Sequence, residues 1–285
     1  MATRADEALA TATAGDTPGR RGRGVGDSLV RVAAPLAVGV LILLAWEIVV
    51  RVNEIPHYIL PAPSLVWGEL LVSWPTLWPS LLVTLRIAGL ALLAAVVGGV
   101  GLAILCSLSR WVELALFPYA VILQVTPVVS VAPLILIYVE STTAAVVLCA
   151  WLVAFFPILS NTTLGLNSAD HNLRDLFELY RTSRWQQLRH LRLPSALPYF
   201  LGGLRIAGGL SLIGAVVAEY VAGTAGTGTG LAFRVLEAQY RLNIPRMFAG
   251  LLLLALTGIA IYLFFTALSW LLLRKWHESA VRRER

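Results

Sequence analysis

The chain has 285 residues, of which 58% are hydrophobic and only 13% are charged, and its mean hydropathy is +0.78. Water-soluble domains carry about 25% charged residues and about 45–50% apolar ones. The composition therefore excludes an ordinary soluble enzyme, a disordered chain and a nucleic-acid-binding protein as leading explanations, and it favours a protein that lies in a lipid bilayer.

Six apolar segments are each about 20 residues long or longer, which is enough to cross the bilayer as a helix. In chain order they are residues 32–50, 80–108, 112–139, 142–166, 199–222 and 247–273. The third segment holds three prolines, so we expect it to be kinked or broken and buried among its neighbours. Residues 51–79 carry five prolines and are expected to form a loop. The predicted fold class is an all-α membrane protein with six transmembrane helices.

The positive charges predict the orientation of this membrane protein. With both termini in the cytoplasm, 16 of the 22 Lys and Arg residues fall on inside segments and five on outside segments. This bias predicts an N-in/C-in arrangement, in which the net charge of +6 reflects orientation and not nucleic-acid binding. Residues 1–28 are expected to be a disordered cytoplasmic tail, 29–277 the transmembrane domain, and 278–285 a basic cytoplasmic tail.

Residues 167–198 are too polar to lie in lipid and predict two short amphipathic helices on the cytoplasmic side. Apolar residues recur at i, i+3, i+4 and i+7, which marks one face of a helix, at Leu173, Leu176, Phe177 and Tyr180. The charged residues Asp175, Glu178 and Arg181 lie off that face. Ser183 and Gln186 have the spacing of a capping box, and Pro194 and Pro198 are expected to break the chain before the fifth span. The pair of helices either packs on the bundle alone or docks a cytoplasmic partner.

The stretch LRDLFELYRTSRWQQLRHLRLP and the span that follows it resemble the cytoplasmic loop and following helix of binding-protein-dependent ABC importer permeases. The resemblance is greatest to the group that handles nitrate, sulfonates, taurine and thiamine-type pyrimidines. It extends to IPHYILPAPSLV at 55–66 and QVTPVVSVAPLILI at 124–137, and it covers about residues 32–277.

This resemblance implies a type I ABC importer permease fold in the bacterial inner membrane, with 167–198 as a coupling loop that docks an ATPase subunit. The docking residues it implies are Leu173, Asp175, Leu176, Phe177, Glu178, Tyr180, Arg181 and Pro194. The implied partners are that ATPase, a periplasmic or lipid-anchored solute-binding protein, a second permease copy (the same or a different chain) and membrane lipids. Neither a cofactor nor a metal is expected on this chain, and ATP and Mg²⁺ would bind the ATPase.

Arg181 stands where the family has a glycine, and Asp175, Leu176 and Phe177 replace its Glu-Ala-Ala triplet. The loss of the glycine disfavours a turn with positive φ, so we expect weaker docking or an atypical partner.

Candidate pathway residues are few. Gln124 and Thr126 are polar groups in the proline-rich third span, and Glu219 is an ionisable residue near the outer end of the fifth. Glu219 either lines or gates the pathway or is simply solvated at the interface. The Gly-rich run 223–230 is expected to be a flexible outer loop.

The sequence shows neither a catalytic constellation nor a P-loop, and its one lysine, Lys275, follows the last span. We therefore expect a transport subunit and not an enzyme. The alternative is a secondary transporter or channel that works without an ATPase. A membrane-embedded enzyme is a weaker alternative, because no residues are placed for catalysis.

Overall fold

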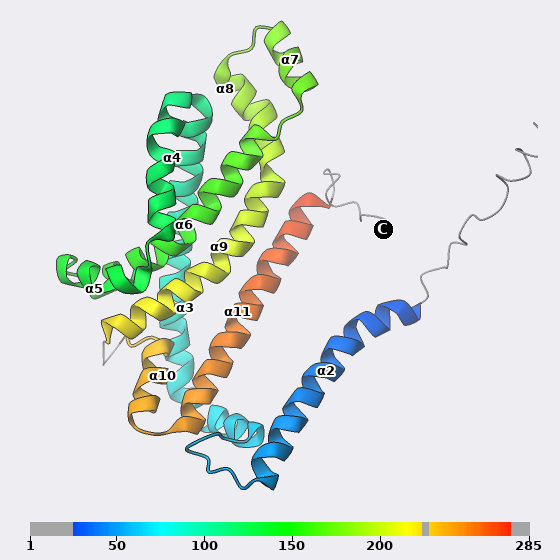
Figure 1. Cartoon of the computed structure of the whole chain (residues 1–285). Coiled ribbons are helices and arrows are strands. Elements are labelled where there is room, and N and C mark those ends of the chain that lie inside the picture. The colour runs from blue at the N-terminus through cyan, green and yellow to red at the C-terminus, as the bar shows by residue number, and fades with distance from the viewer. Residues whose placement is uncertain (1–24, 224–227, 275–285) are drawn as a thin grey trace, which may run out of the picture. The chain divides into compact units, whose positions relative to one another are not determined.

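The computed structural model describes residues 25–223 and 228–274, where all regular structure is helical (Figure 1). The elements are α2 (Val25–Val52), α3 (Pro63–Leu108), α4 (Arg110–Val125), α5 (Val128–Tyr138), α6 (Thr142–Asn167), α7 (His171–Leu179), α8 (Arg184–Gln187), a π-helical turn η1 (Leu188–Arg192), α9 (Leu193–Ala222), α10 (Leu231–Tyr240) and α11 (Ile244–Leu273). Within this part of the chain five helices are long and apolar enough to span a membrane, and the bent pair α4 and α5 makes a sixth. The predicted all-α class is confirmed.

The chain divides into two compact units, residues 1–54 and 55–285. In the first unit, α2 begins at Val25, four residues inside the expected tail 1–28. Most of its apolar side chains between residues 33 and 52 are exposed, as suits contact with lipid. The expected tail segments 1–24 and 278–285 lie outside the described residues.

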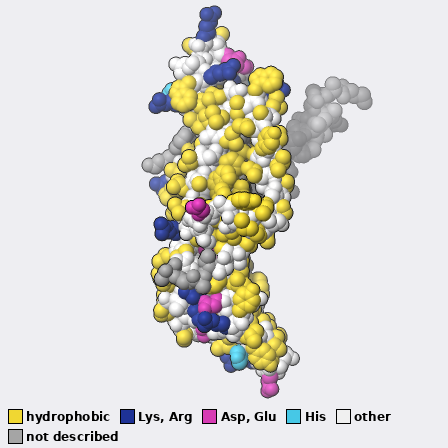
Figure 2. All heavy atoms as spheres, turned by 90° about the vertical axis from the view of Figure 1, so that its left-hand side faces the viewer, with side chains coloured by type: hydrophobic (Ala, Val, Ile, Leu, Met, Phe, Trp, Pro, Cys, Tyr) yellow, Lys and Arg dark blue, Asp and Glu magenta, His cyan; other side chains and the backbone are white. Residues whose placement is uncertain are grey.

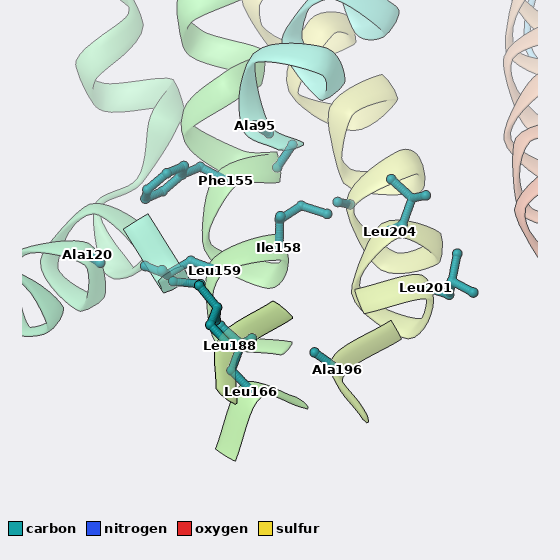
Figure 3. Packing of buried hydrophobic residues seen from close by; sticks show 13 residues of the cluster. Ala95, Ala120, Phe155, Ile158, Leu159, Leu166, Leu188, Ala196, Leu201 and Leu204 are labelled. Atoms are coloured by element: carbon teal, nitrogen blue, oxygen red, sulfur yellow. The ribbon is translucent and has the colours of Figure 1, made fainter. Parts of the chain in front are cut away.

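In the second unit, α3, α6 and α9 form the centre of the bundle, and small residues let the helices approach closely. A side chain at Gly165 would lie 2.7 Å from the Cα of Ala196, and one at Gly214 would lie 2.8 Å from the Cα of Ala150. A hydrophobic cluster that includes Ile158 and Leu204 fills the space between these helices (Figure 3). On the outer surface, hydrophobic side chains cover most of the face in Figure 2.

The prediction of a loop over residues 51–79 is wrong for residues 63–79, which form the start of α3. A proline fits the first turn of a helix, where its missing N–H has no intrahelical partner. Tertiary packing then holds the helix through Pro75 and Pro79. The apolar residues buried along this first part of α3 form a hydrophobic cluster with residues of α10 and α11. The buried members of this cluster are Val66, Leu70, Leu77, Leu81, Leu231, Ala249 and Leu253. Helix α10 itself was not anticipated from the sequence.

The third span is broken, as predicted, and its halves α4 and α5 meet at 101° around Thr126 and Pro127. The prediction that this span is buried among its neighbours is wrong. Ala120 and Ala132 are the buried residues of the two halves. The other side chains are wholly or partly exposed in the single chain, as suits a segment that faces lipid or another subunit.

Candidate functional site

Helix α7 carries an apolar face that the described residues leave largely exposed. Asp170 caps the helix by accepting a hydrogen bond from the backbone N–H of Asn172 at 2.7 Å. None of its residues, 171–179, is buried. Leu173 and Leu176 are 46% and 45% exposed, Phe177 is half-buried, and Tyr180 follows at 75%. Exposed Leu179 extends this apolar surface; its spacing of three from Leu176 could have revealed it in the sequence. The carboxylates of Asp175 and Glu178 are exposed beside the apolar face.

Arg181 ends α7 in the turn that the sequence led us to doubt. Its φ is +48°, its N–H donates to the carbonyl of Glu178 at 2.8 Å, and the N–H of Thr182 donates to the carbonyl of Phe177 at 3.1 Å. These two bonds define a Schellman motif, whose left-handed position is usually glycine. The turn therefore forms without glycine, at a conformational cost of about 1 kcal/mol.

The second predicted helix begins at the capping box of Ser183 and Gln186, which is confirmed. The predicted break at Pro194 and Pro198 is wrong, because α8, η1 and α9 run on as one continuous helical segment. Pro194 lies in the first turn of α9, after a π-turn in which the N–H of Leu193 bonds the carbonyl of Leu188. The wider π register accommodates a proline that donates no hydrogen bond.

Two arginines attach the segment of α8 and η1 to the end of α3. Arg184 donates to the carbonyl of Leu108 at 3.2 Å, and Arg192 donates to that of Ser107 at 2.9 Å. These carbonyls lie in the last turn of α3, where cations are favourable. Leu188, 1% exposed, adds an apolar anchor and lies beside Leu166 of α6 (Figure 3). The sequence offered no signal for the arginine contacts, whose partners are 76 and 85 residues away.

Gln124 and Thr126 line one cavity of about 380 Å³ at the bend between α4 and α5. Its other walls come from α4, α5, α6 and α9, and they consist of Leu123, Val128, Val131, Leu152, Val153, Pro157 and Leu210. The hydroxyl of Thr126 donates to the carbonyl of Ile122 at 2.7 Å, so its lone pairs remain available to accept. The amide of Gln124 is exposed. The structure thus brings these two predicted residues together.

Glu219 does not line that cavity. Its side chain is buried, and its carboxylate accepts hydrogen bonds from the hydroxyl of Thr84 at 2.8 Å and from the N–H of Ala232 at 3.0 Å. The Thr84 hydroxyl in turn accepts from the N–H of Leu231 at 2.8 Å. Because a side chain at Gly230 would overlap the carboxylate, that glycine permits the approach. Glu219 and Thr84 therefore cap the N-terminus of α10 and join it to α9 and α3.

Residues 95–276 match the family described as binding-protein-dependent transport system inner membrane components. The chain is 37% identical over 241 residues to a riboflavin transport system permease protein of Chloroflexus aurantiacus, covering 84% of this chain and 88% of that one. It is 32% identical over 226 residues to a formylaminopyrimidine transport permease protein of Halalkalibacterium halodurans, covering 79% and 88%. Other relatives are named as nitrate import and taurine transport permeases.

A solved structure of an amino acid ABC transporter superposes with a TM-score of 0.59 at 18% identity, over 72% of this chain and 96% of that one, which confirms the fold. The match to the family spans more than half of the chain, and it agrees with the bundle of apolar helices described above. The chain belongs to the binding-protein-dependent ABC transporter inner-membrane family, as a multi-pass permease component.

Proposed function

We propose that this permease carries a small organic nutrient inward, driven by ATP hydrolysis on a separate ATPase subunit that docks on α7. One observation carries the proposal. The apolar face formed by Leu173, Leu176, Leu179 and Tyr180 is exposed on a capped helix, in a family whose members work in binding-protein-dependent transport. An amphipathic helix with such a face fits a hydrophobic groove on a partner.

The wider assembly follows from the same family membership. A solute-binding protein delivers the nutrient from outside, and a second permease copy completes the membrane unit. The exposed apolar surface of α4 and α5 supports this second contact, because it lies beside the cavity of Gln124 and Thr126. In this proposal ATP and Mg²⁺ bind the ATPase subunit and not the permease. The positive charges support the N-in/C-in orientation, which places α7 in the cytoplasm.

The substrates named for relatives support two classes of nutrient. The riboflavin and formylaminopyrimidine relatives favour a nitrogen heterocycle, whereas the nitrate and taurine relatives favour a small anionic compound. The rival function is a transporter or channel that needs no ATPase.

Co-purification of the tagged permease with ABC ATPase subunits from the same cells tests the docking. We expect Leu176→Asp, and separately Phe177→Asp, to abolish ATPase association, because a charge in an apolar groove is left unpaired. The matched control is Asn172→Asp, which adds the same charge to an exposed position of α7 near its N-terminus, where it is favourable. Wild-type amounts of ATPase bound to both interface variants would refute the docking, and uptake in vesicles that lack any ATPase would establish the rival function.

A further inference from the structure

The cavity at the α4–α5 bend has walls that carry no charge. Seven of its nine lining residues are apolar, and the other two, Gln124 and Thr126, are neutral. Its volume of about 380 Å³ lies in the range of about 300–1,000 Å³ that is typical of sites for small organic molecules. The cavity is therefore large enough to hold a small organic molecule. The side chains in its lining that can form hydrogen bonds to such a molecule are the amide of Gln124 and the hydroxyl of Thr126.

The helices that form the cavity also keep their charged residues away from it. Helices α5 and α6 contain no charged residue at all. On α4 the charges are Arg110 and Glu113, which precede Gln124 by 14 and 11 residues, or about 21 and 16 Å along the helix axis.

On α9 the charged residues are Arg205 and Glu219, which lie about 140° and 180° around the helix from the cavity residue Leu210. Arg205 instead lies over the ring of Tyr262 on α11, 5.7 Å from its centroid, and Glu219 caps α10. No cation on these four helices is therefore placed to pair with a ligand in the cavity.

The absence of a cation from the cavity lining, and from the parts of α4, α5, α6 and α9 that form it, decides between the two nutrient classes. An anion that leaves water for an apolar cavity without a paired cation loses several kcal/mol of hydration. A neutral ring loses little, and its flat faces pack on branched apolar walls such as Val131 and Val153. The Gln124 amide offers both a donor and an acceptor, which matches the paired donor and acceptor of an amide or aminopyrimidine edge.

We propose that this cavity is a substrate subsite for uncharged, planar nitrogen heterocycles, and that the amide of Gln124 forms hydrogen bonds with their amide-like edge. The inference rests on the proposed transport function and narrows its substrate class. It predicts that small anions such as nitrate, and sulfonates such as taurine, do not bind here.

The test is direct binding to the purified permease–ATPase complex without the binding protein, by equilibrium dialysis of radiolabelled probes. The probes are riboflavin and formylaminopyrimidine as neutral rings, and nitrate and taurine as the anion and the sulfonate. We expect at least one of the two ring compounds to show saturable binding, and we expect no binding of nitrate or taurine. Gln124→Leu is expected to lower the affinity for the ring about tenfold, because the amide-like edge of the ring loses its hydrogen bonds to the Gln124 side chain. Thr126→Val is expected to lower it several-fold.

The matched control is Gln239→Leu, which removes the same amide from an exposed position on α10 and should leave binding unchanged. Saturable binding of nitrate or taurine, no binding of either ring compound, or equal affinity in Gln124→Leu and Gln239→Leu would each overturn the proposal. The proposed function has a separate readout, since ATPase association through α7 does not depend on which probe binds.

Discussion

Replacing Thr84 with valine tests the cap that joins α3, α9 and α10. Thr84 is completely buried, and its one hydroxyl both donates to the Glu219 carboxylate and accepts from the N–H of Leu231. Valine has the same shape, so the substitution removes these hydrogen bonds and leaves the packing in place.

The magnitude follows from the two bonds. A hydrogen bond to a charged group is worth about 1.5–3 kcal/mol, and the Leu231 N–H left buried without an acceptor costs about 1–3 kcal/mol more. We therefore expect Thr84→Val to lower the free energy of unfolding by about 2.5–6 kcal/mol. At about 2–4 °C per kcal/mol for a chain of this size, the melting temperature falls by at least about 5 °C.

The assay is thermal unfolding in detergent, followed with a thiol-reactive fluorescent dye. It suits this protein because Cys106 and Cys149 are free and buried, so the dye reacts as the bundle opens. Thr84→Ser keeps the hydroxyl and should lose only about 1 kcal/mol for one buried methyl group. The control Thr266→Val removes a hydroxyl that bonds only the preceding turn of its own helix. A Thr84→Val protein that melts within about 2 °C of the wild type would refute the capping role, and a Thr84→Ser protein as unstable as Thr84→Val would assign the effect to packing.

Three further predictions concern the cytoplasmic segment and α10. Arg181→Gly should raise the melting temperature by about 2–4 °C, because glycine adopts a positive φ without the conformational cost of about 1 kcal/mol that arginine bears. A lower melting temperature would contradict the Schellman turn. Alanine at both Arg184 and Arg192 should lower the amount of substrate transported per ATP hydrolysed several-fold in proteoliposomes, while the ATPase still co-purifies. If the ratio of substrate transported to ATP hydrolysed were unchanged, a role of these two arginines in coupling would be refuted. The hydrogen bond from Arg234, together with the nearby positive charges, lowers the pKa of the Glu237 carboxyl in the folded protein. The ionised carboxylate therefore contributes its full stabilisation at a pH above the pKa of the unfolded chain. This stabilisation is lost as the pH falls through the lower pKa of the folded protein. Melting temperatures measured between about pH 5 and pH 3 should therefore fall less in Glu237→Gln than in the wild type, and parallel curves would contradict this.

What the sequence predicted correctly depends on local chemistry. Hydrophobic length marked the spans, the Leu173–Leu176–Phe177 spacing marked α7, and the Ser183 capping box marked α8, because each signal lies within a few residues. The start of α3 at Pro63 was missed because its helix is held by α10 and α11, more than 150 residues later in the chain.

The site was less predictable than the helices, because its contacts join distant parts of the chain. Gln124 and Thr126 were singled out by polarity in an apolar span, and the bend at Pro127 brings them to one cavity. Glu219 was singled out in the same way, yet its partner Thr84 lies 135 residues away, and no local pattern distinguishes a capping carboxylate from one that lines a pathway.

Helix α3 connects the two ends of the proposed transport mechanism. Its last turn receives Arg184 and Arg192 from the cytoplasmic segment, and Thr84, 24 residues earlier, holds the cap of α10. At 1.5 Å per residue these attachments are about 36 Å apart along the axis, which exceeds the thickness of the hydrocarbon core, about 30 Å. Between them Gly99 lies so close to Ile158 of α6 that a side chain there would contact it at 2.8 Å, so α3 and α6 are packed too tightly to slide independently. In the proposed mechanism, a displacement of α7 and α8 by the ATPase would therefore be transmitted along α3 to the cap of α10, and α3 and α6 would move together beside the cavity that Gln124 lines.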